Sequence, residues 1–126
     1  MSQNQNIEKA AMKAANFYEK NRVGVFPRKA KRSEGFDLES KDRKIEVKGT
    51  KLPWNEFQHS YHIVSDNERR HATYLYLFCN VLDEPDPHVF EMSKVHKALE
   101  PEVRYRLEFS LCANDEEEET RKEGRD

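Results

Sequence analysis

The sequence lacks the features that would direct it into a membrane or out of the cell. Its 126 residues contain no apolar run approaching the roughly 18 residues that a membrane-spanning helix needs. The first six residues, Met-Ser-Gln-Asn-Gln-Asn, carry no basic flank and lead into no apolar stretch, so we expect no signal peptide. The sequence therefore predicts a cytoplasmic protein with no membrane partner.

Cysteine is also scarce, which argues against a disulfide-stapled fold. The two cysteines, Cys79 and Cys112, both lie in apolar runs, so we expect small buried side chains in a reducing compartment. The histidines His59, His62 and His71 are spaced by three and nine residues, with no cysteine pair nearby. That spacing does not match a structural zinc site.

No charge of one sign dominates the composition, but the charge is unevenly distributed along the chain. Charged residues make up 37% of the sequence and the net charge is −2, which argues against a protein that coats DNA through charge alone. Residues 1–51 carry +6, whereas residues 52–112 and 113–126 each carry −4. The basic part predicts a patch for phosphates, although an ordinary solvated surface would show the same count. Its densest cluster comprises Arg28, Lys29, Lys31 and Arg32.

The hydrophobic pattern indicates one domain over residues 1–112, followed by an acidic tail over residues 113–126 that we expect to be disordered. The nearly continuous apolar run 74–82 predicts a central strand covered on both faces, and residues 103–111 are expected to close the sheet. This order predicts an α/β (α+β) fold with a mixed sheet of about five strands flanked by helices. The expected helices cover residues 4–21, 66–73 and 93–99, and the other expected strands cover residues 36–38, 44–48, 57–64 and 88–92.

The segments 36–38 and 44–48 both alternate apolar and polar residues, which is typical of a β-hairpin. If Leu38 lies opposite Ile45, a regular antiparallel ladder places Phe36 opposite Val47. These four side chains would then share one face and build the core. A slip of one residue would bury the charged side chains instead, so the pattern favours this register.

The same register places Asp37 directly opposite Glu46 on the other face, with Lys48 two residues further along. Two carboxylates in opposite positions normally destabilise a hairpin. A divalent cation removes that penalty, and Mg²⁺ typically binds one or two protein carboxylates together with water and phosphate oxygens. Lys48 could then orient or deprotonate a water molecule near the metal. The alternative is an exposed polar face on which Lys48 forms an ordinary salt bridge.

Two segments of this hairpin resemble the core of the PD-(D/E)XK nuclease superfamily. They read Gly-Phe-Asp-Leu-Glu-Ser at residues 35–40 and Ile-Glu-Val-Lys-Gly at residues 45–49. The glycine and the aromatic residue before the aspartate look most like the NO VEIN C-terminal-type domain, and Mrr-like restriction endonucleases are more distantly similar. Residues 65–72, which precede an aromatic strand, are also similar to that domain. Phe36 stands where the superfamily has its named proline, a substitution common in this branch.

The resemblance covers roughly residues 7–82 and implies a restriction-endonuclease-like fold that hydrolyses DNA phosphodiester bonds with Mg²⁺ or Mn²⁺. It implies that the metal ligands are Asp37, Glu46 and the Val47 carbonyl oxygen. The first helix of such domains often carries a glutamate that faces the metal site, and Glu8 is the matching position, with Glu19 as the alternative. The catalytic set implied in this way is Asp37, Glu46, Lys48 and Glu8.

Several residues outside the hairpin allow two interpretations each. Asn67 and Glu68 could cap the short helix or support the catalytic lysine in the cleft, as the resemblance implies. Arg69 and Arg70 could contact the nucleic-acid backbone or be ordinary surface residues. Trp54 could stack on a base, although a lone loop tryptophan more often packs over a sheet edge.

The sequence thus favours a metal-dependent endonuclease acting on DNA in defence or repair, either as a homodimer or within a larger assembly. The competing hypothesis is a non-catalytic module that binds nucleic acid or a partner protein on the same fold. A small structural protein with no polyanionic partner is a third interpretation, and it predicts no salt-dependent association with DNA.

Overall fold

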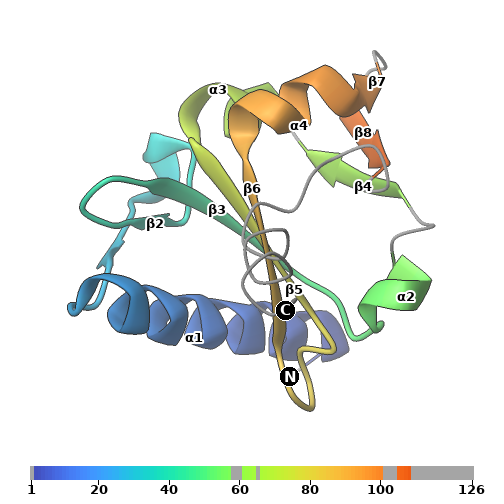
Figure 1. Cartoon of the computed structure of the whole chain (residues 1–126), viewed down its shortest axis with the longest axis horizontal. Helices are drawn as coiled ribbons and strands as arrows, with labels where there is room; N and C mark the ends of the chain where they lie inside the picture. The colour runs from blue at the N-terminus through green and yellow to red at the C-terminus, as the bar shows by residue number, and fades with distance from the viewer. Residues whose placement is uncertain (1, 58–60, 65, 101–104, 109–126) are drawn as a thin grey trace, which may run out of the picture.

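The computed structural model describes residues 2–57, 61–64, 66–100 and 105–108, and Figure 1 shows their arrangement. None of the helices in this part of the chain is long and apolar enough to cross a lipid bilayer. The helices are α1 (Gln3–Val23), the 3-10 turn η1 (Arg32–Glu34), α2 (Trp54–Phe57), α3 (Asp66–His71) and α4 (Met92–Ala98). The strands are β1 (Arg28–Lys29), β2 (Leu38–Glu39), β3 (Lys44–Gly49), β4 (Tyr61–Val64), β5 (Tyr74–Cys79), β6 (Asp86–Glu91), β7 (Leu99–Glu100) and β8 (Tyr105–Glu108).

The main sheet has five strands in the order β1-β2-β3-β5-β6. Strands β3 and β5 pair in parallel, and the other three pairs are antiparallel, so the sheet is mixed, as predicted. The chain between β3 and β5 contains α2, β4 and α3. The predicted α+β fold, with a mixed sheet flanked by helices, is therefore confirmed.

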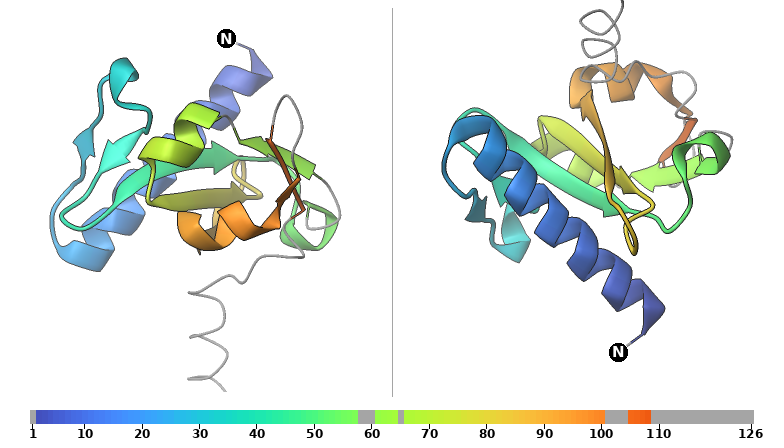
Figure 2. Two further views of the ribbon diagram at one scale, coloured as in Figure 1. Left: turned by 90° about the horizontal axis from the view of Figure 1, so that it is seen from above. Right: turned by 60° about the horizontal axis from the view of Figure 1, so that its bottom comes forward.

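Helix α1 covers one face of the sheet, as Figure 2 shows from two sides. It begins with a capping box, in which the Ser2 hydroxyl accepts from the Gln5 N–H and the Gln5 side chain accepts from the Ser2 N–H. The small residues of α1 let the helix approach closely. A Cβ atom at Gly49 would lie only 2.7 Å from the Cβ of Ala11. The core on this face consists of Ala11, Ala15, Leu38, Ile45, Tyr76, Phe78, Val81 and Val89.

A second apolar cluster covers the opposite face of the sheet, against α2 and α4. Strand β5 contributes alternate residues to the two clusters, so five of its six residues are buried and it is the predicted central strand. Cys79 belongs to this second cluster and is buried, as predicted, and burial raises the pKa of its thiol to about 12. The buried members are Phe36, Phe57, Ala72, Leu75, Leu77, Cys79, Phe90, Met92 and Val95.

The hairpin has the predicted register over both residues of β2, where Glu39 also pairs with Lys44. Leu38 pairs with Ile45, as expected, but the regular ladder ends there. The Asp37 N–H donates to the Ile45 carbonyl oxygen at 2.9 Å, so two consecutive residues of this strand face a single partner, as in a β-bulge. Phe36 consequently packs in the cluster on the opposite face from Leu38. The prediction that Phe36 shares a face with Leu38, Ile45 and Val47 is therefore wrong.

The strand predictions were also wrong for two other parts of the chain. Strand β8 does not close the main sheet but pairs with β4 and β7 in a separate three-stranded sheet. Residues 54–57 form the short helix α2, so the strand predicted over residues 57–64 is wrong at Phe57 and confirmed at β4. An alternating pattern identifies a strand but not the partner with which it pairs. The predicted acidic tail, Ser65, Cys112 and His59 lie outside the described residues.

Candidate active site

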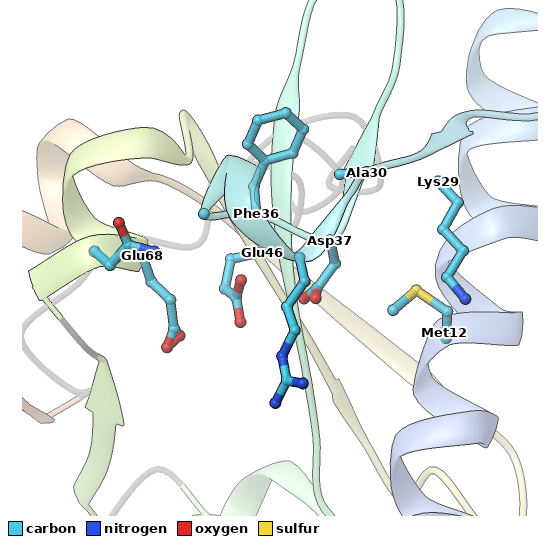
Figure 3. A pocket seen from close by; sticks show the side chains of 10 residues that line it. Met12, Lys29, Ala30, Phe36, Asp37, Glu46 and Glu68 are labelled. Carbon is cyan, nitrogen blue, oxygen red and sulfur yellow. The ribbon is translucent and has the colours of Figure 1, made fainter.

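A pocket of about 390 Å³ lies beside the first residue of β2, where β3 continues beyond its last residue pair with β2. Its lining comes from α1, from the segment that contains β1 and η1, from β3 and from α3. Figure 3 shows the side chains of Asp37, Glu46 and Glu68 on one side of this space and those of Met12 and Lys29 on the other. The lining residues are Met12, Lys29, Ala30, Arg32, Gly35, Phe36, Asp37, Glu46, Asn67 and Glu68.

Asp37 is held beside Glu46 by bonds to both of its neighbours. Its N–H donates to the carbonyl of Ile45, and its carboxylate accepts from the N–H of Val47 at 2.8 Å. Gly35 makes this turn possible, because it has a φ of 81° and a Cβ atom there would lie 2.9 Å from the imidazole of His71. The predicted proximity of the two carboxylates is thus achieved through a bulge and a side-chain bond rather than through a regular ladder.

Glu46 carries the strongest electrostatic conflict in the pocket. Only 6% of the residue is exposed, and burial together with the nearby charges of Asp37 and Glu68 raises the pKa of its carboxyl to about 9. The ammonium of Lys48 lies 3.2 Å from Glu46 Oε2 and opposes this shift, but does not overcome it. Lys48 alone therefore does not balance the three carboxylates of Asp37, Glu46 and Glu68.

Lys48 lies on the same side of the sheet as Glu46, as predicted, and is held from two directions. Its Nζ atom donates to both carboxylate oxygens of Glu68, at 3.0 and 3.1 Å. Burial alone would lower the pKa of Lys48, but the charges of Glu46 and Glu68 raise it above the ordinary value. Glu68 reaches this position from α3, and Asn67 lines the same wall of the pocket. A position for Glu68 beside the lysine is one of the two alternatives that the sequence left open.

The donor set of this pocket suits a hard divalent cation. Asp37 and Glu46 supply two carboxylates, which is the number that Mg²⁺ commonly takes from a protein. The Val47 N–H donates to Asp37 at the edge of β3 that faces the pocket. Because the N–H and the carbonyl of one strand residue point to the same side, the Val47 oxygen faces this edge too. The described residues contain no group of three or more His, Cys, Asp or Glu side chains placed to hold a metal, so protein side chains would supply only part of the shell. The remaining ligands would be water and phosphate oxygens.

Helix α1 presents a methionine to the pocket rather than an acid. Met12 lines the pocket, whereas Glu8 is exposed one helical turn earlier and is not among the lining residues. Glu19 lies elsewhere, fully buried, with its carboxylate bonded to Arg22 and to the hydroxyl of Tyr76. Met12 could have been found from the sequence, because it follows Glu8 by one turn on the same side of the helix.

The predicted basic cluster is divided by the structure. Lys29 and Arg32 line the pocket, and neither has an ion-pair partner among the described residues. The Arg28 guanidinium instead bonds the carboxylates of Glu34 and Glu39, and these hydrogen bonds raise its pKa. Residues 28 and 29 form β1. Lys31 is exposed.

The remaining candidates lie on the surface or away from the pocket. Arg70 is exposed on α3, and the side chain of Arg69 is outside the described part of the structure. Trp54 stacks on His88, with ring centroids 4.1 Å apart and planes inclined by 17°, and packs against the apolar cluster under α2. Trp54 therefore packs against the sheet, as the more common of the two alternatives predicted.

This arrangement defines an α+β protein with a pocket lined by three carboxylates and two basic side chains, beside the ammonium of Lys48. The family model described as "Protein NO VEIN, C-terminal" matches residues 7–92, which include every residue that lines the pocket. The chain therefore belongs to the NO VEIN C-terminal family. No curated protein and no solved structure matches the chain.

Proposed function

We propose that this protein is a metal-dependent nuclease that hydrolyses phosphodiester bonds in DNA, with the PD-(D/E)XK type of active site. The convergence of Asp37 and Glu46 in one pocket beside Lys48 carries the proposal. The raised pKa of Glu46 supports it, because a buried carboxyl next to further acids favours an added cation. Lys29 and Arg32 place positive charge on the same pocket, where a phosphate would enter.

Each residue has a distinct role in the proposed reaction. Asp37, Glu46 and the Val47 carbonyl would hold Mg²⁺ or Mn²⁺. When bound, this ion supplies polarisation of a phosphoryl oxygen and lowers the pKa of a water ligand. Lys48 orients the attacking water and stabilises negative charge that develops on the phosphate oxygens.

Three other residues would support these roles. Glu68 holds the Lys48 ammonium in place, and Lys29 and Arg32 bind the phosphate and keep it in line with the water. One pocket hydrolyses one strand, so cutting a duplex through both strands needs two copies of the chain or two successive events. A homodimer would meet this requirement.

A plasmid-nicking assay tests the proposal. Supercoiled DNA is incubated with the full chain and Mg²⁺ or Mn²⁺, and the native protein is compared with Asp37→Asn and Lys48→Ala. Lys41→Ala is the matched control, because Lys41 is an exposed lysine in the β2–β3 turn and does not line the pocket. We expect nicking by the native chain and the control. We also expect a loss of about 10²-fold or more in each pocket variant.

The same assay distinguishes a nuclease from a non-catalytic binding module. Equal nicking by all four proteins would assign the activity to a contaminant and contradict the proposal. Retained DNA binding with no nicking by any of the proteins, with either metal, would favour a binding module that uses the same pocket.

A further inference from the structure

The outward side of α1 carries two lysines beside the pocket. Lys9 and Lys13 are both exposed and lie one helical turn apart. Since successive residues of an α-helix are rotated by about 100°, Lys9 lies about 60° around the helix from Met12, which lines the pocket. The two lysines therefore form a basic edge that continues the α1 wall of the pocket toward solvent. Figure 3 shows Met12 on α1 and the side chain of Lys29 extending toward it from β1.

This pair of charges has no partner within the described structure. Neither lysine has an ion pair or hydrogen bond through its side chain among the described residues. The helix has acids only at Glu8 and Glu19, and Glu19 is buried and bonded to Arg22. Like charges four residues apart destabilise a helix by about 0.2–0.5 kcal/mol. The chain thus keeps a small electrostatic cost at this edge, whereas it neutralises Arg28 with two carboxylates.

The charges around the pocket are separated by side. Lys9 and Lys13 continue the α1 wall, and Lys29 extends from β1 toward that wall. The opposite wall carries Glu68 on α3. A polyanion that places one phosphate in the pocket is therefore attracted to the α1 side, whereas the Glu68 carboxylate on the other side is already paired with Lys48. This difference in charge favours a path along α1 for the bound strand.

We propose that Lys9 and Lys13 bind the phosphates that flank the scissile phosphate, so that the nucleic-acid backbone runs along the outward side of α1. The proposal rests on the proposed nuclease function, since it takes the pocket as the position of the cut. Four residues of helix rise about 6 Å, which is close to the separation of successive phosphates on one strand. Such contacts carry no sequence information and supply affinity that depends on salt.

The test measures DNA binding as a function of salt, using the full chain. A fluorescently labelled DNA duplex is titrated with protein in Ca²⁺, which keeps hydrolysis from interfering, and anisotropy gives the affinity at several NaCl concentrations. The double variant Lys9→Gln/Lys13→Gln keeps good helix-forming residues, so we expect α1 to remain folded. Lys41→Gln removes one exposed lysine from the β2–β3 turn and serves as the matched control.

We expect the slope of log affinity against log salt to be smaller by about 1.8 in the double variant, because each duplex phosphate contact contributes about 0.9. Lys41→Gln should leave the slope unchanged. In the nicking assay, the double variant should raise KM and leave kcat near the native value. A native slope in the double variant, or no salt-dependent binding by the native chain, would overturn the proposal.

Two further outcomes distinguish this surface from the nuclease proposal. A reduced slope in the double variant, with no nicking by the native chain, would refute the nuclease and leave the binding surface standing. Nicking by the native chain with an unchanged slope in the double variant would refute the surface alone. Competition by polyglutamate as effective as competition by DNA would assign the surface to an acidic protein segment and also overturn the proposal.

Discussion

Each side of the main sheet contains a buried glutamate, and the pKa values of the two carboxyls are shifted in opposite directions. Glu19 is fully buried between α1 and the sheet, yet hydrogen bonds from Arg22 and Tyr76 outweigh its burial and hold its pKa below the ordinary value. Glu46 is nearly as buried, but burial and neighbouring acids raise its pKa to about 9. Hydrogen bonds from the protein favour the charged form of Glu19, whereas burial and neighbouring acids favour the neutral form of Glu46.

This difference agrees with a structural role for Glu19 and with the proposed metal-binding role for Glu46. Around Glu19 the chain builds a closed network, because Arg22 also bonds Asp42 and the Tyr76 hydroxyl accepts from Arg43. The network ties α1 to the β2–β3 turn and thereby helps to fix the hairpin that carries the pocket. Around Glu46 the cation in contact within the described residues is Lys48, which is shared with Glu68. A buried site with unbalanced charge is typical of a site that binds a ligand.

The largest expected effect of a single substitution is on cleavage, at Glu46. Glu46→Gln keeps the shape of the side chain but removes a metal ligand, so we expect the nicking rate to fall by about 10²-fold or more. Because the native carboxyl already favours its neutral form, the unfolding free energy without metal should change by less than about 1 kcal/mol. Urea denaturation and the nicking assay on the same preparation measure the two effects. A large loss of stability would contradict the contrast drawn between the two glutamates.

The matched change on the other side of the sheet should have the opposite profile. Glu19→Gln removes a charge that Arg22 and Tyr76 both contact, and leaves the guanidinium with Asp42 alone. We expect the unfolding free energy to fall by about 2 kcal/mol, which is below the range for fully buried pairs because Arg22 is partly exposed. The nicking rate per folded molecule should stay within about twofold of native. A rate loss as large as that of Glu46→Gln would place both glutamates in the active site.

The pH dependence of metal binding follows from the direction of the Glu46 shift. Without metal, the unfolded chain loses the Glu46 proton near pH 4.5, whereas the folded chain retains it up to about pH 9. The contribution of Glu46 to the free energy of unfolding therefore falls as pH rises between these two values. Mg²⁺ must displace this proton, so its apparent affinity should rise by about tenfold per pH unit below pH 9.

Thermal-shift titrations with Mg²⁺ at about pH 6 and about pH 8.5 test this linkage, with a larger stabilisation expected at the higher pH. Glu19 has a lowered pKa, so its contribution to stability is present above the ordinary carboxyl pKa and disappears as pH falls, with or without Mg²⁺. A magnesium effect that is equal at both pH values would show that Glu46 does not release a proton to the metal.

The smallest expected effect concerns the α1 wall of the pocket. Met12→Glu would place a carboxylate where the structure has a thioether, and would give the metal a third acidic ligand. We expect Mg²⁺ affinity to rise by about fivefold, measured by calorimetry, since a third charge adds about 1 kcal/mol in a partly screened site. Glu8→Gln, one turn away and exposed, should change the affinity by less than about twofold. An unchanged affinity in Met12→Glu would place the ion away from α1.

The sequence predicted those features that follow from local patterns. The Leu38–Ile45 register, the buried strand β5 and the helix α1 are all present, because their apolar spacing allows few other arrangements. The side chains of Glu46 and Lys48 share a face for the same reason. Membership of the NO VEIN C-terminal family, indicated by the motif around Asp37, is likewise confirmed.

Features that depend on distant partners could not be predicted in this way. The bulge that turns Phe36 to the other side of the sheet lies next to Gly35, which packs closely against His71, a residue far away in the sequence. The pairing of β8 with β4 depends on which edges remain available after the main sheet forms. Met12 was not predicted, because its apolar side chain gives no chemical signal and only its helical spacing from Glu8 points to this wall of the pocket.

A crystal of the full chain soaked in Mn²⁺ tests directly whether Asp37 and Glu46 bind a metal ion, through the anomalous scattering of that ion. The account predicts a single strong peak in the pocket, about 2.0–2.2 Å from carboxylate oxygens of both Asp37 and Glu46, with the Val47 carbonyl or water completing the shell. A pocket without a peak at saturating Mn²⁺, or an ion bound by other side chains, would contradict it.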